Sequence, residues 1–165
     1  MDTFFEQLIK IKKNAKTWCI YLGIALVAIV FLTAAYLVFK RIFVVLAALI
    51  FWGTFKLYSL LEVEYEYIIT NSSMDIDKIT AKSSRKRIFS FELTEIEKIE
   101  KYRKEMPGDI INDAFFACNR DDENVYVLVI NQEGKGKKSV VISPNERLRE
   151  AMVKFLPKYI SENLL

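Results

Sequence analysis

Residues 18–61 read WCIYLGIALVAIVFLTAAYLVFKRIFVVLAALIFWGTFKLYSLL, and their only charged side chains are Lys40, Arg41 and Lys56. Residues 18–39 carry no charge, and a helix of this length, at ~1.5 Å per residue, extends ~33 Å, enough to cross a hydrocarbon core of ~30 Å. Residues 42–61 form a second apolar run of similar length. The stretch therefore predicts an α-helical transmembrane hairpin, with spans at 18–39 and 42–61 and a tight turn at 40–41.

Two alternatives to the hairpin fit this stretch less well. A cleaved signal peptide has an apolar region of ~7–15 residues, shorter than the first run, and a second apolar run follows here at once. One continuous helix places Lys40 and Arg41 in the middle of the bilayer, at a cost of roughly 2.5–3.5 kcal/mol each. The hairpin places both at an interface instead, although no Gly, Pro or Asn marks the turn.

The basic residues beside the spans predict the orientation. Residues 1–17 form a basic amphipathic lead-in with four lysines, whereas the turn has two basic residues. The four are Lys10, Lys12, Lys13 and Lys16. Because Lys and Arg are enriched on the cytoplasmic side, we expect a two-span protein of the cell membrane with both termini in the cytoplasm.

The start of the lead-in, residues 4–13, places four apolar side chains on one side at helical spacing. These are Phe4, Phe5, Leu8 and Ile9. Two interpretations stay open: an interfacial helix that lies on anionic lipid, or a frayed segment that only sets the topology.

The composition excludes several classes of function. Residues 62–165 carry 17 basic and 19 acidic side chains, so the net charge of +3 for the chain comes from the spans and their flanks. Because the polar part has no excess of basic residues, a nucleic-acid partner is not expected. Histidine, the commonest general base and metal ligand, is absent. Cys19 begins the first apolar run and Cys118 lies deep in the tail, so we expect no disulfide and a reducing compartment. The chain also has no catalytic motif. We therefore expect that it is not an enzyme and that it binds no cofactor, metal or small-molecule substrate.

Behind residue 61, apolar side chains alternate with glutamates, as in a half-buried strand with one wet face. The apolar face comprises Val63, Tyr65, Tyr67 and Ile69. Further strands are predicted at residues 74–82, 85–92, 115–119, 125–131 and 138–142. Residues 93–102 fit a helix or, as we prefer, a short turn followed by an edge strand. Residues 106–114, with Pro107, are predicted to form a loop.

The C-terminal part switches back to helical spacing. Ser143-Pro144-Asn145-Glu146 is typical of a helix start, with Ser143 as the N-cap and Pro144 at the first helical position. The predicted apolar stripe consists of Leu148, Met152, Phe155, Leu156 and Tyr159. Pro157 is expected to kink or end this helix. About seven short antiparallel strands and one amphipathic helix indicate an α+β domain over residues 62–165.

This order of elements resembles the bacterial membrane-anchored PH-like domain proteins, in which the domain often follows a pair of transmembrane helices. The likeness rests on Tyr65-Glu66-Tyr67-Ile68-Ile69-Thr70-Asn71, Met74-Asp75-Ile76, Arg85-Lys86-Arg87-Ile88-Phe89-Ser90-Phe91 and Ile96-Glu97-Lys98-Ile99. The whole chain is also similar to small two-helix membrane proteins of Gram-positive bacteria. The resemblance implies antiparallel β-sheets in a partly open barrel of about seven strands, with a C-terminal capping helix. It carries over no functional residues, and Ser83-Ser84 stands where the group often has Gly.

The densest basic cluster is the candidate lipid-binding site, and it comprises Lys82, Arg85, Lys86 and Arg87. Each basic residue near an anionic membrane surface contributes about 1 kcal/mol, and the resemblance adds that eukaryotic PH domains bind phosphoinositides with basic residues around an early hairpin. The alternative is a solvated hairpin that deters edge pairing, above all if the glutamates of the preceding strand pair with Arg85 and Arg87.

Two other features are predicted to be inert. Asp121-Asp122-Glu123 lacks the alternating ligand spacing and the Gly of a calcium loop. Cys118 has no histidine to activate it and is expected to be a small buried side chain.

These patterns lead to a membrane-anchored, non-enzymatic PH-like interaction or scaffold module at the inner leaflet. Its partners are expected to be the lipid bilayer and either another protein or a second copy of the chain. The alternative is a domain that senses anionic lipid headgroups through the basic cluster. A component of an intramembrane enzyme or transporter is a remote alternative, because the spans contain no Asp, Glu or His.

Overall fold

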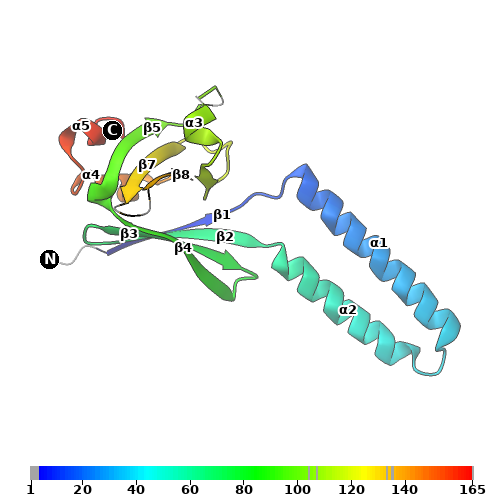
Figure 1. Cartoon of the computed structure of the whole chain (residues 1–165). Coiled ribbons are helices and arrows are strands. Elements are labelled where there is room, and N and C mark those ends of the chain that lie inside the picture. Colours follow the sequence, from blue (N-terminus) through cyan, green and yellow to red (C-terminus); the bar gives the residue numbers. More distant parts are fainter. Residues whose placement is uncertain (1–3, 104, 107, 133, 135, 165) are drawn as a thin grey trace. The chain divides into compact units, whose positions relative to one another are not determined.

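The computed structural model describes residues 4–103, 105–106, 108–132, 134 and 136–164, which group into two compact units (Figure 1). The smaller unit holds residues 12–63 and 80–84, and contains two long helices and the turn of a β-hairpin. The larger unit holds residues 1–11, 64–79 and 85–165, and contains two four-stranded sheets with the C-terminal helices. The chain thus begins in the larger unit, leaves it for the helices and then returns to it.

Helices α1 (Ala15–Val38) and α2 (Phe43–Leu60) form the helical hairpin. Asn14 is the N-cap of α1, because its Oδ1 accepts hydrogen bonds from the backbone N and the Oγ1 of Thr17, both at 2.9 Å. The helix therefore begins before the charge-free run, and the turn covers residues 39–42 rather than 40–41 alone. By length and composition both helices can cross a membrane.

Aromatic contacts join the two helices near both ends. The rings of Tyr21 and Tyr58 meet edge-on at 5.0 Å, and the Tyr58 hydroxyl donates a hydrogen bond to the Tyr21 carbonyl at 3.2 Å. Beside the turn, the rings of Tyr36 and Phe43 meet edge-on at 5.5 Å. Each such pair contributes about 0.5–1.5 kcal/mol beyond the area that it buries, so these contacts stabilise the ends of the hairpin.

The first sheet has the order β1-β2-β3-β4, and its strands are β1 (Phe4–Lys10), β2 (Val63–Thr70), β3 (Ser73–Thr80) and β4 (Ser84–Glu92). Strand β1 pairs antiparallel with β2, from Phe4 opposite Thr70 to Lys10 opposite Glu64. Residues 4–10 are therefore neither an interfacial helix nor a frayed segment. They are an edge strand of the domain, and the helical hairpin lies between β1 and β2 in the sequence.

The local sequence of β1 fits a strand as well as it fits a helix. Exposed and partly buried residues alternate along the strand. The partly buried ones are Phe5, Gln7 and Ile9. An isolated helix of this length is unstable in water, whereas the edge of β2 offers a row of unpaired N–H and C=O groups. The partner begins at Val63, beyond both helices, and local periodicity carries no information about so distant a partner.

The second sheet has the order β5-β7-β8-β6, and its strands are β5 (Ile96–Lys101), β7 (Tyr126–Gln132), β8 (Gly136–Ile142) and β6 (Phe115–Phe116). A 3-10 turn at Leu93–Glu95 precedes β5, an edge strand of this sheet, which confirms the preferred interpretation of residues 93–102. Strand β6 pairs with β8 in parallel, so the antiparallel prediction is wrong there. A short helix, α3 (Gly108–Ile111), interrupts the predicted loop, whose Pro107 lies outside the described residues.

The C-terminal part consists of α4 (Glu146–Val153) and α5 (Lys158–Ser161). Asn145 is the N-cap of α4, because its Oδ1 accepts a hydrogen bond from Leu148 N at 2.8 Å. The prediction of Ser143 as the N-cap is wrong. The backbone of Ser143 instead bonds to the sheet: its carbonyl accepts from Gln7 Nε2 at 2.9 Å, and its N–H donates to the Tyr67 hydroxyl at 3.3 Å.

Pro157 ends the regular part of this helix, as predicted: α4 stops before it, and α5 begins directly after it. Leu148, Met152 and Leu156 are buried, in agreement with the predicted stripe. Tyr159 is 73% exposed and does not belong to that stripe, because the break at Pro157 starts a new helix with its own phase.

The core of the larger unit combines side chains from both sheets and from α4. The first sheet supplies Tyr67, Ile69, Met74 and Ile76, all fully buried, which confirms the predicted inward face of β2. The second sheet and α4 add Leu128, Val140, Ile142, Leu148 and Met152. Burial of one such side chain is worth about 1.5–3 kcal/mol, so this core organises the fold of the larger unit.

Candidate functional site

The four predicted lipid-binding residues lie on and beside the hairpin between β3 and β4. Ala81 and Lys82 both have left-handed backbone, with φ of 55° and 54°, and Ser83 N donates to the Thr80 carbonyl at 3.2 Å. Two consecutive residues with positive φ are typical of a tight two-residue hairpin turn. The turn is therefore centred at Ala81-Lys82 and needs no glycine at Ser83-Ser84.

The two lysines of the cluster differ in their surroundings. Lys82 belongs to the smaller unit, where its Nζ lies 3.7 Å from Glu62 Oε2, and both side chains are exposed. An exposed pair of this kind contributes only about 0–1 kcal/mol. Lys86 is exposed on β4, and no ion pair joins it to an acidic side chain in the described part of the chain.

The two arginines of β4 are paired with acidic side chains of β2 and β3. Arg85 Nη2 lies 2.5 Å from Glu66 Oε2. Arg87 bridges two aspartates, with Nη2 2.9 Å from Asp75 Oδ2 and Nε 3.3 Å from Asp77 Oδ1. The arginine side chains are 54% and 56% exposed, so each guanidinium still has a face in solvent, but its charge is compensated within the sheet.

Two of the acidic partners are buried, and one of them, Glu66, stands on the predicted wet face of β2. Glu66 and Asp77 are each 3% exposed. Burial raises the pKa of Glu66, a hydrogen bond with Glu6 raises it further, and the Arg85 charge opposes both effects. The prediction of a solvated glutamate face on β2 is therefore wrong at Glu66. Removing Arg85 would leave a buried carboxylate without its cation, so this arginine is required within the fold.

Cys118 has the environment of an inert thiol. It is 5% exposed and packs in a cluster with Val125, Val127 and Val141. Burial, with a smaller effect from Asp122, raises its pKa to about 12, so the thiol stays protonated near neutral pH. The expectation of a small buried side chain is confirmed.

Among the described residues, no group of three or more His, Cys, Asp or Glu side chains is arranged to hold a metal ion. In the acidic turn, Asp122 Oδ2 accepts a hydrogen bond from Asn119 Nδ2 at 3.1 Å, and Asn119 Nδ2 also donates to the Lys10 carbonyl at 3.1 Å. Asn119 therefore links this turn to the end of β1.

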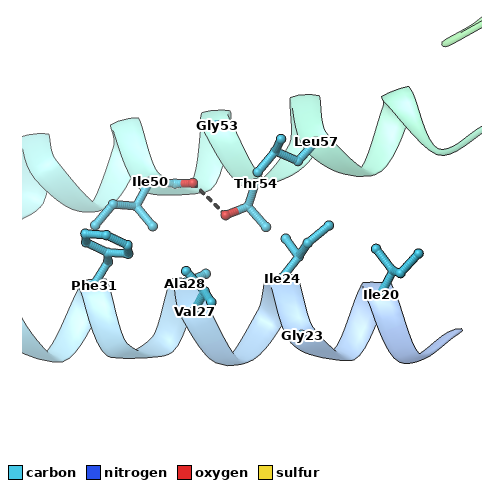
Figure 2. Close-up of a pocket in the computed structure, with 10 residues that line it drawn as sticks. All are labelled: Ile20, Gly23, Ile24, Val27, Ala28, Phe31, Ile50, Gly53, Thr54 and Leu57. Atoms are coloured by element: carbon cyan, nitrogen blue, oxygen red, sulfur yellow. Dashed lines mark hydrogen bonds between the residues drawn. The ribbon is translucent and has the colours of Figure 1, made fainter. Parts of the chain in front are cut away.

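A groove of about 550 Å³ lies between the helices of the smaller unit, and it was not among the sites predicted from the sequence. Figure 2 shows side chains of both helices pointing toward it. The lining residues of α1 are Ile20, Gly23, Ile24, Val27, Ala28 and Phe31. The lining residues of α2 are Ile50, Gly53, Thr54 and Leu57.

Two glycines leave this groove open. A Cβ atom added at Gly23 or Gly53 would meet no atom within 4 Å, so neither glycine serves close contact between α1 and α2. The only polar side chain in the lining, Thr54, donates its hydroxyl to the Ile50 carbonyl at 2.8 Å. Gly23 and Gly53, one in each apolar run, are the sequence signal that could have indicated the groove.

Three large apolar side chains are exposed in the described part of the larger unit: Phe4 at 61%, Leu8 at 46% and Tyr159 at 73%. Phe4 and Leu8 both lie on β1, and Tyr159 lies on α5. Exposed aromatic and apolar side chains of this kind are enriched in protein–protein contacts. The sequence pattern placed Phe4 and Leu8 in the lead-in and Tyr159 in the apolar stripe of the C-terminal helix.

A family model described as Bacterial PH-like domain (DUF6106) matches residues 1–162. The match includes β1 and both long helices as well as the two sheets. Comparisons with the curated proteins and with the solved structures gave no match.

Proposed function

The chain belongs to the bacterial PH-like domain family, and from this premise we propose that it is a membrane-anchored, non-enzymatic interaction or scaffold module at the inner leaflet. The observation that carries the proposal is the insertion of the two apolar helices between the paired strands β1 and β2. A PH-like domain interrupted by two such helices is suited to hold a contact surface next to a bilayer.

The chain segments that join the strands to the helices are short. Residues 11–14 separate β1 from α1, and residues 61–62 separate α2 from β2. At ~3.3–3.6 Å per extended residue, four residues reach ~14 Å at most. A domain tethered twice in this way stays within about its own width of the lipid headgroups.

Strand pairing also supports a common side for both termini. Strands of one sheet lie in one compartment, and β1 and β2 stand on opposite sides of the helical hairpin in the sequence. The chain between them must cross the bilayer an even number of times, which two helices satisfy. The four lysines of the lead-in then favour the cytoplasm.

A role in binding rather than catalysis is supported by the chemistry of the larger unit. Histidine is absent from the chain, and Cys118 is a buried thiol with a pKa of about 12. The exposed side chains of Phe4, Leu8 and Tyr159 provide candidate contacts for another protein or for a second copy.

Site-specific photo-crosslinking in intact membranes tests this function. A photoreactive residue replaces Leu8 or Tyr159 in the full chain, and the exposed Glu123 in the acidic turn serves as the control position. We expect a defined protein adduct, with another protein or with a second copy, from Leu8 or Tyr159 and none from Glu123. Adducts with lipid alone, or equal adducts from all three positions, would argue against the interaction module.

The lipid-sensing alternative rests on the basic cluster, Lys82, Arg85, Lys86 and Arg87. Lys86, which is exposed and has no ion pair with the acidic residues that the structure describes, favours it. The exposed faces of both arginines favour it too, although most of the charge is compensated. If it is correct, residues 84–92 exchange their amide hydrogens more slowly in nanodiscs with phosphatidylglycerol than in phosphatidylcholine alone, and Lys86→Gln removes the difference. Lys138→Gln, on β8, is the matched control. Equal exchange in both lipids would end this alternative.

A further inference from the structure

We propose that the groove between α1 and α2 binds one acyl chain of an anionic phospholipid of the inner leaflet. The inference goes beyond the interaction module, but it rests on the proposed membrane insertion of the helical hairpin. Its basis is the shape of the groove, its length and the position of two lysines at one of its ends.

The walls and floor of the groove suit a hydrocarbon chain. Bulky side chains such as Ile24, Phe31 and Leu57 form the walls, and the open positions at Gly23 and Gly53 form the gap between them (Figure 2). The Thr54 hydroxyl already bonds within α2, so no side chain in the lining offers a hydrogen bond to a partner. A narrow slot with apolar walls is filled by a flexible chain more readily than by a second helix with its side chains.

The length of the groove agrees with one leaflet of a bilayer. Its lining on α1 runs from Ile20 to Phe31, which at ~1.5 Å per residue is ~16 Å, about half of a ~30 Å hydrocarbon core. Toward the turn, the helices are joined by the edge-on pair of Tyr36 and Phe43. A docked helix would need a contact surface along most of α1, whereas this groove stops before the part of the helix next to the turn.

Two lysines stand at the end of the groove formed by the start of α1 and the end of α2. Lys16 precedes Ile20 by four residues, so helical spacing places it on the groove side of α1. Lys56 directly precedes the lining residue Leu57 at the same end of the groove, on the flank of α2. Both are exposed, and their long stems allow the amines to reach the headgroup level. The phosphate of a lipid whose chain fills the groove lies at that level. This charge complementarity selects an anionic phospholipid of the inner leaflet.

Native mass spectrometry of the full chain, released from nanodiscs with equal phosphatidylglycerol and phosphatidylcholine, tests the inference. We expect one phosphatidylglycerol retained per chain. Gly23→Leu or Gly53→Leu fills the groove and should lower retention at least fivefold. Ala34→Leu and Ala48→Leu add the same side chain at exposed positions of the same helices and should retain lipid as the wild type does.

The lysines provide a second, independent readout. Lys16→Gln combined with Lys56→Gln should abolish the preference for phosphatidylglycerol over phosphatidylcholine, whereas Lys40→Gln at the turn should leave it unchanged. Circular dichroism of each variant verifies that both helices still form. Gly23→Ala, which narrows the groove without filling it, should give an intermediate loss of retained lipid.

Several outcomes would overturn the inference. Equal retention in the glycine and alanine variants means that the lipid is only annular. A disulfide between two copies that carry Ile24→Cys in place of their native cysteines, formed in membranes, means that a second copy covers the groove. Alkaline carbonate extraction separates this inference from the proposed function. A chain released by carbonate refutes the membrane anchor itself, whereas a resistant chain with unchanged retention refutes only the lipid site.

Discussion

Tyr67 is fully buried in β2, and its hydroxyl joins two other segments of the larger unit. It donates a hydrogen bond to the Ala117 carbonyl at 2.8 Å and accepts one from Ser143 N at 3.3 Å. Because Tyr67→Phe leaves both backbone groups without this partner in the core, we expect it to lower the free energy of unfolding by about 1–3 kcal/mol.

Denaturant unfolding of the full chain in detergent, followed by the strand signal in circular dichroism, measures this loss. Tyr159→Phe is the matched control, because Tyr159 is 73% exposed and surface changes usually stay within about 0.5 kcal/mol. Equal effects of the two substitutions would contradict the structural role of the Tyr67 hydroxyl.

Glu66 predicts a pH dependence of stability. Burial and the hydrogen bond with Glu6 raise the pKa of its carboxyl group above the ordinary value of 4.5. Between that value and the raised pKa, the folded chain binds more protons than the unfolded chain at this site. Its contribution to stability is therefore fully present at lower pH and is lost as pH rises.

Glu66→Gln removes this titration. We expect the melting temperature of the wild type, relative to Glu66→Gln, to fall as pH rises from about 4.5 toward neutrality. Thermal unfolding at several pH values measures the difference. Glu123→Gln, at an exposed position in the acidic turn, should show no such trend. If the melting temperature of the wild type instead rises relative to that of Glu66→Gln as pH increases, the ion pair with Arg85 outweighs burial.

At the scale of elements, β1 links the first sheet to the segment that precedes α4. Ile9 packs against the cluster of Cys118. Gln7 bonds to two residues just before α4: its Nε2 donates to the Ser143 carbonyl at 2.9 Å, and its Oε1 accepts from Asn145 N at 2.8 Å. A domain cut at residue 62 lacks this strand, so we expect residues 63–165 alone to be poorly folded.

Restoring β1 should restore the domain. Lys10 lies opposite Glu64, so residues 1–11 can be joined to residues 63–165 through an Asn-Gly turn that replaces the helical hairpin. We expect this chain to be soluble and to show dispersed amide resonances, whereas residues 63–165 show collapsed ones. Equally good spectra for both chains would mean that β1 is dispensable.

At the scale of the whole molecule, the hairpin and the strand pairing predict one topology. In a chain whose native cysteines are replaced, the cysteine of Arg41→Cys is expected to react with a membrane-impermeant thiol reagent added outside the cell. The cysteine of Ser83→Cys, in the β3–β4 turn, is expected to react only after the membrane is permeabilised. The reverse pattern would place the larger unit on the outer face and remove the inner-leaflet assignment.

Features set by short-range physics could be predicted from the sequence alone. The two apolar helices, the inward face of Tyr65, Tyr67 and Ile69, the edge strand after Leu93–Glu95 and the break at Pro157 all follow from composition, periodicity or backbone chemistry within a few residues. The membership of the PH-like family, suggested by the order of these elements, is confirmed by the match over residues 1–162.

Features that join distant segments were decided only by the tertiary structure. The residues of β1 fit helical and strand spacing equally well. They form a strand because they pair with β2, which follows both helices in the sequence. The sequence left open whether Arg85 and Arg87 are free or paired, and only the tertiary structure brings Glu66, Asp75 and Asp77 against them. The groove at Gly23 and Gly53 likewise depends on how two helices face each other. Strand pairing, charge compensation and a groove each depend on two segments of the chain. A local sequence pattern contains only one of the two segments.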